Sequence, residues 1–243
     1  MAGSGTTAMV PAMDGATVVV TGASKGIGEQ IAHAVAGAGA HTVICARDAE
    51  ALERVEADIR DAGGSVTAIR TDVRDEYDVE RLVETATRDG DGAIQYVVAN
   101  AGVYHGTAGE TPLTEESYAA FDDHLRTNAR GVFSTIREAV PHLGPDARIV
   151  VPTGVVAREG MPGYGSYAVS KAAAEAVARG FAADLDIPVG AVDPGQVATD
   201  LSGDGGRDPE SVAEMVLWAL RDADPSALDG GVIDWGDYRS ATR

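Results

Sequence analysis

The chain has 243 residues, 44% of them hydrophobic, which is enough for one large α/β domain. Its 38 acidic and 19 basic residues give a formal net charge of −19. That balance argues against a nucleic-acid partner, because contact with a phosphate backbone needs a basic surface. The apolar runs are far shorter than the ~18 residues of a membrane span, so we expect no membrane partner.

The first 13 residues lack the basic and long apolar segments of a signal peptide, so we expect a loose tail followed by a single domain over residues 14–243. Beyond the tail, apolar strand-like runs alternate with segments of helical spacing. This alternation predicts βαβ units, and hence a doubly wound Rossmann fold with about seven parallel strands and helices on both faces. In chain order the predicted elements are strand Ala16–Val20, helix Ile27–Ala38, strand Thr42–Cys45, a helix marked by Leu52, Val55 and Ile59, strand Val66–Ile69, a helix marked by Val79, Leu82, Val83 and Ala86, strand Tyr96–Ala99, the long helical region Ser117–His142, strand Arg148–Val151, helix Ala168–Leu185, strand Pro188–Val192, helix Val212–Leu220 and strand Gly231–Ile233.

A glycine-rich turn follows the first predicted strand. Gly22, Gly26 and Gly28 stand where that strand passes into the first helix. Glycine there lets the backbone turn sharply and approach a pyrophosphate, which the free N–H groups of the helix N-terminus bind. A glycine-rich turn alone is weak evidence, since any tight turn uses glycine, but its place after the first strand predicts a dinucleotide site.

Tyr167 and Lys171 are four residues apart, and Lys171 is one of only two lysines in the chain. On a helix such residues share a face. An ammonium beside a phenol favours the phenolate, so we expect the pKa of Tyr167 to be lowered toward working pH, as a phenolic general acid/base requires. The other lysine, Lys25, lies inside the glycine-rich turn.

Six motifs, which include the glycine-rich turn and the Tyr167–Lys171 pair, follow one another along the chain as they do in the short-chain dehydrogenase/reductase family. The resemblance to this family covers about residues 14–235. It implies that Tyr167 and Lys171 are the catalytic pair and that Asn128 holds a water linking Lys171 to solvent. Val197 and Thr199 would bind the carboxamide of the cofactor. The motifs are T-G-A-S-K-G-I-G (Thr21 to Gly28), Asp72-Val73, Asn100-Ala101-Gly102, Asn128 in N-A-R-G, Tyr167 with Lys171, and Pro194-Gly195-Gln196-Val197-Ala198-Thr199.

The resemblance implies an oxidoreductase that interconverts a ketone or aldehyde with an alcohol, acts on a small molecule, and forms a homo-oligomer, either a dimer or a tetramer. The residues expected to bind the cofactor are Gly22, Ser24, Lys25, Gly26, Ile27, Gly28, Arg47, Asp72, Val73, Asn100, Ala101, Gly102, Tyr167, Lys171, Pro194, Gly195, Val197 and Thr199.

One position departs from the family. A serine that polarises the substrate carbonyl usually lies thirteen residues before the tyrosine, and here that position is Gly154. Thr153 is adjacent, but successive residues at a strand end point to opposite faces. Three alternatives are open: Thr153 takes over the role of the serine, catalysis proceeds without that hydroxyl, or the protein is impaired. We name Thr153 as a candidate catalytic residue and expect its hydroxyl within about 5 Å of the Tyr167 hydroxyl.

The end of the second predicted strand bears on the choice of cofactor. An NAD enzyme usually has an acidic residue there to bind the ribose 2′-hydroxyl. In this chain Arg47 stands there, and Asp48 comes one step later as a candidate N-cap for the next helix. Arg47 and Lys25 could both reach a 2′-phosphate. We therefore predict NADP in preference to NAD.

The substrate pocket is less well specified. We expect Tyr104, His105, Arg158, Met161 and Tyr164 to line it, because they follow the Asn-Ala-Gly turn or precede Tyr167. The five histidines show no metal-binding spacing, so we predict no metal. Two other functions are kept open. One is a non-catalytic NADP-binding regulatory or scaffold protein, and the other is a 3-oxoacyl-thioester reductase, for which a basic docking patch is lacking.

Composition also bears on the setting of the protein. Cys45 is the single cysteine and lies in an apolar strand, so no intramolecular disulfide can form and a reducing cytoplasm is expected. Only two of the 19 basic residues are lysines, and acidic residues are scattered along the helices. This pattern is typical of proteins from high-salt cytoplasm, where salt screens carboxylate repulsion. A GC-rich genome in ordinary salt is the alternative.

Overall fold

The computed structural model describes residues 13–199 and 205–243, so residues 1–12 of the predicted tail lie outside the described part. Within these ranges, seven strands form one parallel sheet in the order β3-β2-β1-β4-β5-β6-β7. The doubly wound Rossmann fold is thereby confirmed. The strands are β1 Thr17–Thr21, β2 His41–Ala46, β3 Ser65–Arg70, β4 Ile94–Val98, β5 Leu143–Pro152, β6 Val189–Asp193 and β7 Val232–Asp234.

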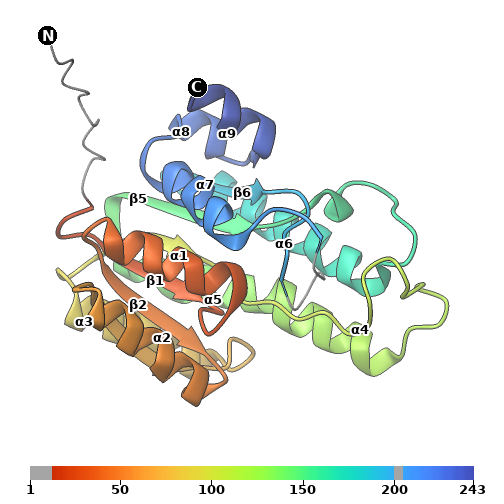
Figure 1. The fold of residues 1–243 in the computed structure, drawn as a ribbon, viewed down its shortest axis with the longest axis horizontal. Helices are drawn as coiled ribbons and strands as arrows, with labels where there is room; N and C mark the ends of the chain where they lie inside the picture. The colour runs from red at the N-terminus through yellow and green to blue at the C-terminus, as the bar shows by residue number, and fades with distance from the viewer. Residues whose placement is uncertain (1–12, 200–204) are drawn as a thin grey trace, which may run out of the picture.

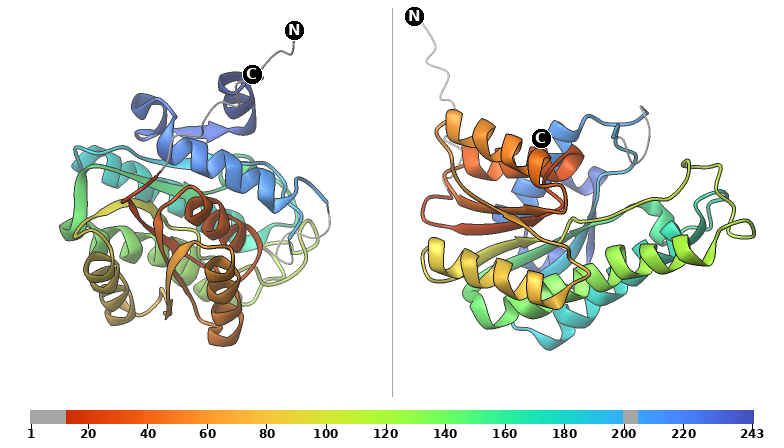
Figure 2. Two further views of the ribbon diagram at one scale, coloured as in Figure 1. Left: turned by 60° about the vertical axis from the view of Figure 1, so that its left-hand side comes forward. Right: turned by 90° about the horizontal axis from the view of Figure 1, so that it is seen from below.

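Helices cover both faces of this sheet (Figures 1 and 2). Helices α1, α2 and α7 pack on one face, and α3, α5 and α6 pack on the other. The α-helices are α1 Gly26–Gly37, α2 Ala49–Asp61, α3 Glu76–Asp89, α4 Tyr118–His124, α5 Gly131–Ala139, α6 Gly165–Asp184, α7 Pro209–Arg221, α8 Pro225–Leu228 and α9 Trp235–Ala241, and the other helical turns are the π-helical η1 Leu125–Arg130 and the 3-10 turns η2 Val140–His142 and η3 Val155–Ala157.

The central strands are buried on both faces because successive side chains point to opposite sides. In β1, Val18 and Val20 belong to the apolar cluster under α1, α2 and α7, whereas Val19 belongs to the cluster under α3, α5 and α6. Each side chain is fully buried. A strand that is buried on both faces has no solvent-facing side on which polar residues would alternate with apolar ones. This explains why these strands are continuous apolar runs in the sequence.

The long helical region predicted over Ser117–His142 is helical but not uniform. It starts as α4, widens into the π-helical turn η1, and continues as α5 and η2. Turns of this kind are frequent at functional sites. In this chain the π-helical turn holds Asn128 in the interior. Figure 1 shows α4 extending away from the sheet at the right.

Some elements were not predicted. Strand β5 begins at Leu143 rather than Arg148, and α8, α9 and η3 were missed. The segment Gly144-Pro145-Asp146 has poor strand propensity. Leu143 nevertheless pairs with Ile94 of β4, next to an irregularity in the register. Tertiary pairing therefore overrides the local preference of this segment.

The sheet order places the site. Strand β1 has β2 on one side and β4 on the other, so successive strands are added in opposite directions from this point. Ligands of open parallel sheets bind at such a switch point, outside the carboxyl ends of the strands. The glycine-rich turn after β1 and the Asn-Ala-Gly turn after β4 meet at this edge.

Candidate active site

A cavity of about 1150 Å3 opens at the carboxyl edge of the sheet. It is lined from one side by the turns after β1, β2, β3 and β4, and from the other by the ends of β5 and β6 and the start of α6. Every residue predicted to bind the cofactor lies in its wall. Together with the candidate Thr153, these wall residues are Gly22, Ser24, Lys25, Gly26, Ile27, Gly28, Arg47, Asp72, Val73, Asn100, Ala101, Gly102, Tyr167, Lys171, Pro194, Gly195, Val197 and Thr199.

The glycine-rich turn can accept a pyrophosphate. Gly22 and Gly26 have φ angles of +68° and +61°, where residues with a Cβ are strained. A Cβ at Gly28 would lie 2.2 Å from the Gly22 carbonyl oxygen, so the first turn of α1 is packed directly on the loop. The side chain of Lys25 does not cap α1. These features fit a dinucleotide phosphate held against the helix N-terminus.

Asn100 fixes the turn from the neighbouring strand. Its side-chain nitrogen donates hydrogen bonds to the carbonyl oxygens of Thr21 (2.9 Å) and Gly22 (3.2 Å). In return, the Thr21 hydroxyl accepts from the backbone N–H groups of Asn100 and Ala101, each at 3.0 Å. The two turns therefore hold each other in place across the switch point.

The end of β2 carries positive charge. Arg47 is exposed at the rim of the cavity, as is Lys25. Asp48 accepts a hydrogen bond from the Ala51 N–H (3.1 Å), so it caps α2 as predicted. A third cation at this rim, Arg54 of α2, was missed, because no local sequence signal connects it with the turn after β1.

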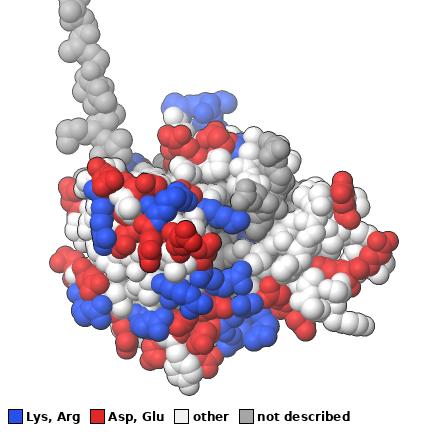
Figure 3. All heavy atoms as spheres, turned by 60° about the horizontal axis from the view of Figure 1, so that its bottom comes forward, with Lys and Arg blue, Asp and Glu red and all other residues white. Residues whose placement is uncertain are grey.

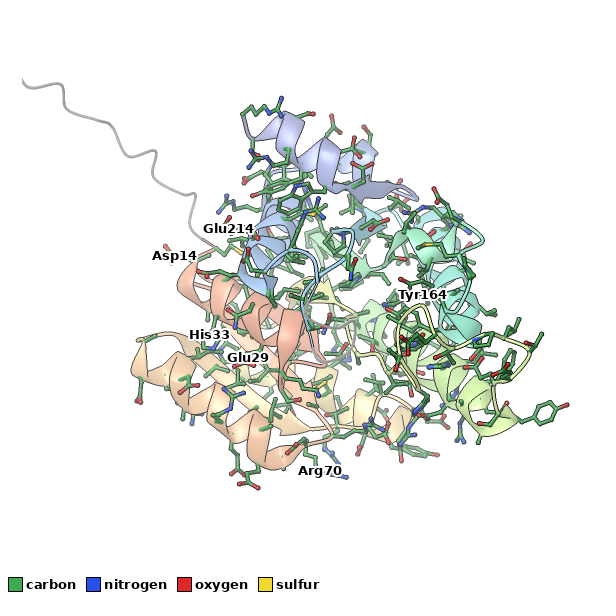
Figure 4. The ribbon with its side chains drawn as sticks, turned by 45° about the vertical axis from the view of Figure 1, so that its right-hand side comes forward. Asp14, Glu29, His33, Arg70, Tyr164 and Glu214 are labelled. Carbon is green, nitrogen blue, oxygen red and sulfur yellow. The ribbon has the colours of Figure 1, made fainter. Side chains whose placement is uncertain are left out.

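Arg54 is tied to the glycine-rich turn. Its guanidinium donates to the Ser24 carbonyl oxygen (3.3 Å) and pairs with Glu29 of α1 (2.8 Å), which is labelled in Figure 4. After the neighbouring strand β3, Asp72 is paired with Arg74 at 2.7 Å. The hydrogen bond from Arg74 lowers the pKa of the Asp72 carboxyl below its usual value. The carboxylate of Asp72 is thus already engaged by protein.

Tyr167 and Lys171 share one face of α6, as predicted. The Lys171 Nζ lies 5.8 Å from the centre of the Tyr167 ring and donates to the Pro152 carbonyl oxygen at 2.9 Å. The predicted lowering of the Tyr167 pKa is wrong for this structure. Burial, with smaller contributions from Tyr104 and Tyr164, raises the pKa of Tyr167. Burial also lowers the pKa of Lys171 to about 8, against the opposing effect of Glu175 and Asp193.

Aromatic rings support Tyr167 from behind. The centres of the Tyr104 and Tyr167 rings are 4.8 Å apart, and the fully buried His124 ring is 6.1 Å from Tyr167. The Tyr104 hydroxyl donates to the carbonyl oxygens of Thr107 and Gly163. Tyr104 therefore restrains the phenol of Tyr167 rather than facing the cavity.

The substrate-side predictions are confirmed in part. Met161 and Tyr164 line the cavity, and Figure 4 labels Tyr164 beside the start of α6. His105 does not line it, and its Nε2 contacts Asp123 at 2.9 Å. Arg158 is also outside the cavity wall, because its guanidinium is turned toward Glu175 and Asp193. The remaining wall includes Ala108, Val155 and Val156, so this side of the cavity is largely apolar.

Asn128 is buried in the π-helical turn, so it is not a helix-surface residue. Its oxygen accepts from the Val103 N–H (2.8 Å), and its nitrogen donates to the Val103 carbonyl oxygen (2.9 Å) and the Ser170 hydroxyl (2.9 Å). Asn128 thus joins the segment after β4 to α6. Its predicted role in holding a water stays a prediction.

Gly154, at the position where the family usually has a serine, has room for a side chain. Gly154 has a φ of −163°, an extended conformation that any residue adopts. A Cβ there would have Val156 Cγ2 as its nearest neighbour, at 3.9 Å. The Thr153 hydroxyl donates to Glu175 Oε1 at 2.8 Å, on the side of α6 beyond Lys171. This bond counts against the alternative in which Thr153 takes over the role of the serine, and the other two alternatives stay open.

Acidic and basic side chains are interspersed on the face shown in Figure 3, with several Lys and Arg side chains near its centre.

Residues 13–199 and 205–243 contain no group of three or more His, Cys, Asp or Glu residues that could hold a metal ion. In the same described ranges, no helix is both long and apolar enough to cross a membrane.

The fold and the cavity define a dinucleotide-binding protein of the Rossmann class, with a tyrosine–lysine pair beside the nucleotide site. The family model for short chain dehydrogenases matches residues 16–210, so the chain belongs to the short-chain dehydrogenase/reductase family and is an oxidoreductase of that family.

Relatives and solved structures agree with this assignment. A probable tetrahydroxynaphthalene reductase from Zymoseptoria tritici is 34% identical over 195 residues, which are 78% of this chain and 71% of that protein. A glycine betaine reductase from Emericella nidulans is 32% identical over 243 residues, covering 91% of this chain but only 19% of that much longer protein. The crystal structure of a short chain dehydrogenase from Burkholderia cenocepacia in complex with NADP has a TM-score of 0.82 and 28% identity, covering 91% of this chain and 96% of that one.

Proposed function

We propose that this protein is an NADP(H)-dependent oxidoreductase that interconverts a ketone or aldehyde with an alcohol, with Tyr167 as the acid/base. The observation that carries the proposal is the position of Tyr167 and Lys171 in the wall of the same cavity as the glycine-rich turn. The nicotinamide, when bound, supplies or accepts a hydride at its C4 carbon. The remaining chemistry, a proton transfer at the substrate oxygen, belongs to the chain.

Tyr167 would give its phenolic proton to the carbonyl oxygen during reduction and take it back during oxidation. Burial raises the pKa of Tyr167, so the phenol holds the proton that reduction requires but is a weaker acid than a free tyrosine. Lys171 would hold the nicotinamide ribose and replenish the proton, and Asn128 would hold a water on the path to solvent. Thr153 remains a candidate for polarising the carbonyl, although its hydroxyl donates to Glu175.

Two observations support NADP over NAD. The acidic residue near the end of β2, Asp48, is used as the N-cap of α2, which leaves Arg47 and Lys25 at the rim where a 2′-phosphate would lie. A guanidinium binds a phosphate through two parallel hydrogen bonds. In addition, the structural relative from Burkholderia cenocepacia was solved with NADP.

The test is a panel of ketones, hydroxyarenes, steroids and 3-oxoacyl thioesters, followed by the consumption of NADPH, with the Tyr167→Phe variant measured in parallel. We expect turnover of at least one carbonyl compound. In Tyr167→Phe, turnover should fall at least ~100-fold with NADPH affinity nearly unchanged, because the change removes the proton donor and not a cofactor contact.

Equal turnover in Tyr167→Phe would rule out the assigned mechanism. Tight NADPH binding without turnover of any carbonyl compound would instead favour a non-catalytic NADP-binding regulator or scaffold. Preference for acyl thioesters would identify a 3-oxoacyl-thioester reductase.

The apolar wall formed by Val155, Val156 and Met161 supports a substrate with an apolar body.

We also infer a cytoplasmic homo-oligomer, either a dimer or a tetramer. The cytoplasmic location is inferred from Cys45, a buried cysteine that forms no disulfide. An interface is suggested by Phe133 of α5, which is 44% exposed although the centre of its ring lies 5.8 Å from that of Phe181 of α6. Sedimentation would measure the mass of the particle, and a monomer at micromolar concentration would contradict this inference.

The acidic composition is proposed to be an adaptation to high salt. A compact chain of net charge −19 repels itself, and this repulsion weakens as the Debye length falls from ~10 Å at 0.1 M to ~3 Å at 1 M. We expect the melting temperature to rise as KCl increases over that range. A flat or falling melting temperature would favour the GC-rich alternative.

A further inference from the structure

Three charged side chains meet behind the catalytic pair. Glu175 of α6 and Asp193 of β6 expose only 3% and 7% of their side chains, and the guanidinium of Arg158 forms close ion pairs with both. Arg158 comes from the segment directly after η3. One cation therefore bridges two buried carboxylates from different elements.

Each carboxylate in turn holds part of the site. Glu175 accepts from the Thr153 hydroxyl at the end of β5 (2.8 Å), and Asp193 accepts from the Gly195 N–H (2.8 Å). Gly195 lines the cavity in the turn expected to face the nicotinamide. The cluster thereby ties the end of β5, the catalytic helix and this turn together.

Lys171 lies within the influence of the same cluster. It stands one helical turn before Glu175, and its Nζ donates to the carbonyl oxygen of Pro152, the neighbour of Thr153. Both Glu175 and Asp193 act on its charge. Without a cation between them, two buried carboxylates would attract the Lys171 ammonium, because a charge left unpaired in the interior is strongly unfavourable.

We propose that Arg158 is a positioning residue of this site, which bridges Glu175 and Asp193 and so leaves Lys171 at Pro152, in reach of the cofactor and Tyr167. The functional part of this proposal rests on the oxidoreductase activity proposed above. Arg158 does not itself line the cavity. It acts through the two carboxylates.

The surrounding charged and titratable groups can be named. Lys171 is faced by Glu175, Asp193 and Tyr167, and Arg158 adjoins the two carboxylates. On the outer side, Arg179 of α6 pairs with Glu175 at 3.7 Å. The groups around Tyr167 are Tyr104, Tyr164 and His124. Among these, Arg158 is the cation that contacts both carboxylates.

The chain offers a direct measurement, because Lys25 and Lys171 are its only lysines. Protein labelled with 13C-lysine gives two signals, and the Lys171→Met variant assigns them. The titration of the Lys171 signal then reports its protonation without need of substrate or activity. Lys25 is exposed at the cavity rim, so its signal serves as the internal control in every variant.

In Arg158→Met we expect the midpoint of the Lys171 titration to move up by about one pH unit, because the carboxylates that Arg158 neutralised now favour the ammonium. In Glu175→Gln it should move down, because one carboxylate is removed while Gln can still accept from Thr153. Arg158→Lys should restore the original midpoint, and the added lysine signal is identified by comparison with the parent. The Lys25 midpoint should stay constant throughout.

The same variants are then measured with NADPH. We expect Arg158→Met to weaken cofactor binding about tenfold, as one charge-assisted contact from Lys171 is displaced, and Arg158→Lys to recover most of it. An unchanged Lys171 midpoint in both Arg158→Met and Glu175→Gln would overturn the proposal. If Arg158→Met does not fold, Glu175→Gln alone decides. If the parent reduces no carbonyl compound, the proposed function fails while the lysine titration still tests the cluster.

Discussion

The two halves of the cavity are built in different ways. The half at the carboxyl ends of β1 to β4 is formed mainly by backbone. It consists of the turn with positive φ at Gly22 and Gly26, the N-terminus of α1, and two loops held together by Asn100. The half at the carboxyl ends of β5 and β6 is formed mainly by side chains. Tyr167 packs against aromatic rings there, and Lys171 lies beside the buried ion pairs of Arg158. Backbone geometry leaves a local sequence signal, whereas a side-chain cluster is assembled from distant positions.

The difference also predicts how each half tolerates change. A turn packed against backbone cannot accept an added methyl group, because a shift of the chain is the only relief. The half at the carboxyl ends of β5 and β6 has space at Gly154, where no neighbour comes closer than 3.9 Å to an added Cβ. Glycine is therefore required at Gly28 and replaceable at Gly154.

Gly28→Ala should give the largest effect. The new Cβ would lie 2.2 Å from the Gly22 carbonyl oxygen and 2.5 Å from the Asn100 side-chain nitrogen. Overpacking of this kind costs up to ~3 kcal/mol, which as lost cofactor affinity is about 100-fold. NADPH titration and thermal unfolding would measure it. Gly154→Ala is the matched control and should change neither; equal losses in both variants would break the comparison.

Arg47→Asp should act only on the choice of cofactor. It replaces a cation near the expected 2′-phosphate by a carboxylate that repels phosphate and can accept from a 2′-hydroxyl. A charge-assisted contact is worth ~1.5–3 kcal/mol, so the ratio of NADPH to NADH affinity should fall about 10- to 100-fold. Arg60→Asp, the same change at an exposed position of α2 outside the cavity, is the control. An unchanged ratio would direct attention to Lys25 and Arg54.

Gly154→Ser should have a smaller effect than Arg47→Asp, and it should raise turnover rather than lower a binding affinity. It restores a hydroxyl where negative charge develops on the substrate oxygen, on an extended backbone that accepts serine without strain. Donors of this kind are worth ~2.7–4 kcal/mol in sites built around them. Here we expect a gain in turnover below about tenfold, because the surrounding wall is not shaped to direct the new hydroxyl.

Thr153→Val completes this test, since valine has nearly the shape of threonine without the hydroxyl. The observed hydrogen bond to Glu175 predicts a small loss of stability and little loss of turnover. A large loss of turnover in Thr153→Val with no gain in Gly154→Ser would show that threonine has replaced the serine after all.

Much of the fold followed from the sequence, because its signals are local. Alternation of apolar runs and helical spacing predicted each strand of the sheet to within a few residues, except for the early start of β5. The capping of α2 by Asp48 and the shared helical face of Tyr167 and Lys171 depend on spacings of three and four residues. Interactions over so few residues are fixed by backbone geometry alone.

The tertiary structure decided what depends on burial and on distant partners. The sequence placed an ammonium near Tyr167 but could not show that burial of the phenol outweighs it and raises the pKa. Arg158 was expected in the substrate pocket, yet its guanidinium lies between Glu175 and Asp193, which are 17 and 35 residues away along the chain. Desolvation and long-range charge pairing are properties of the packed molecule, since they depend on which elements the fold brings together.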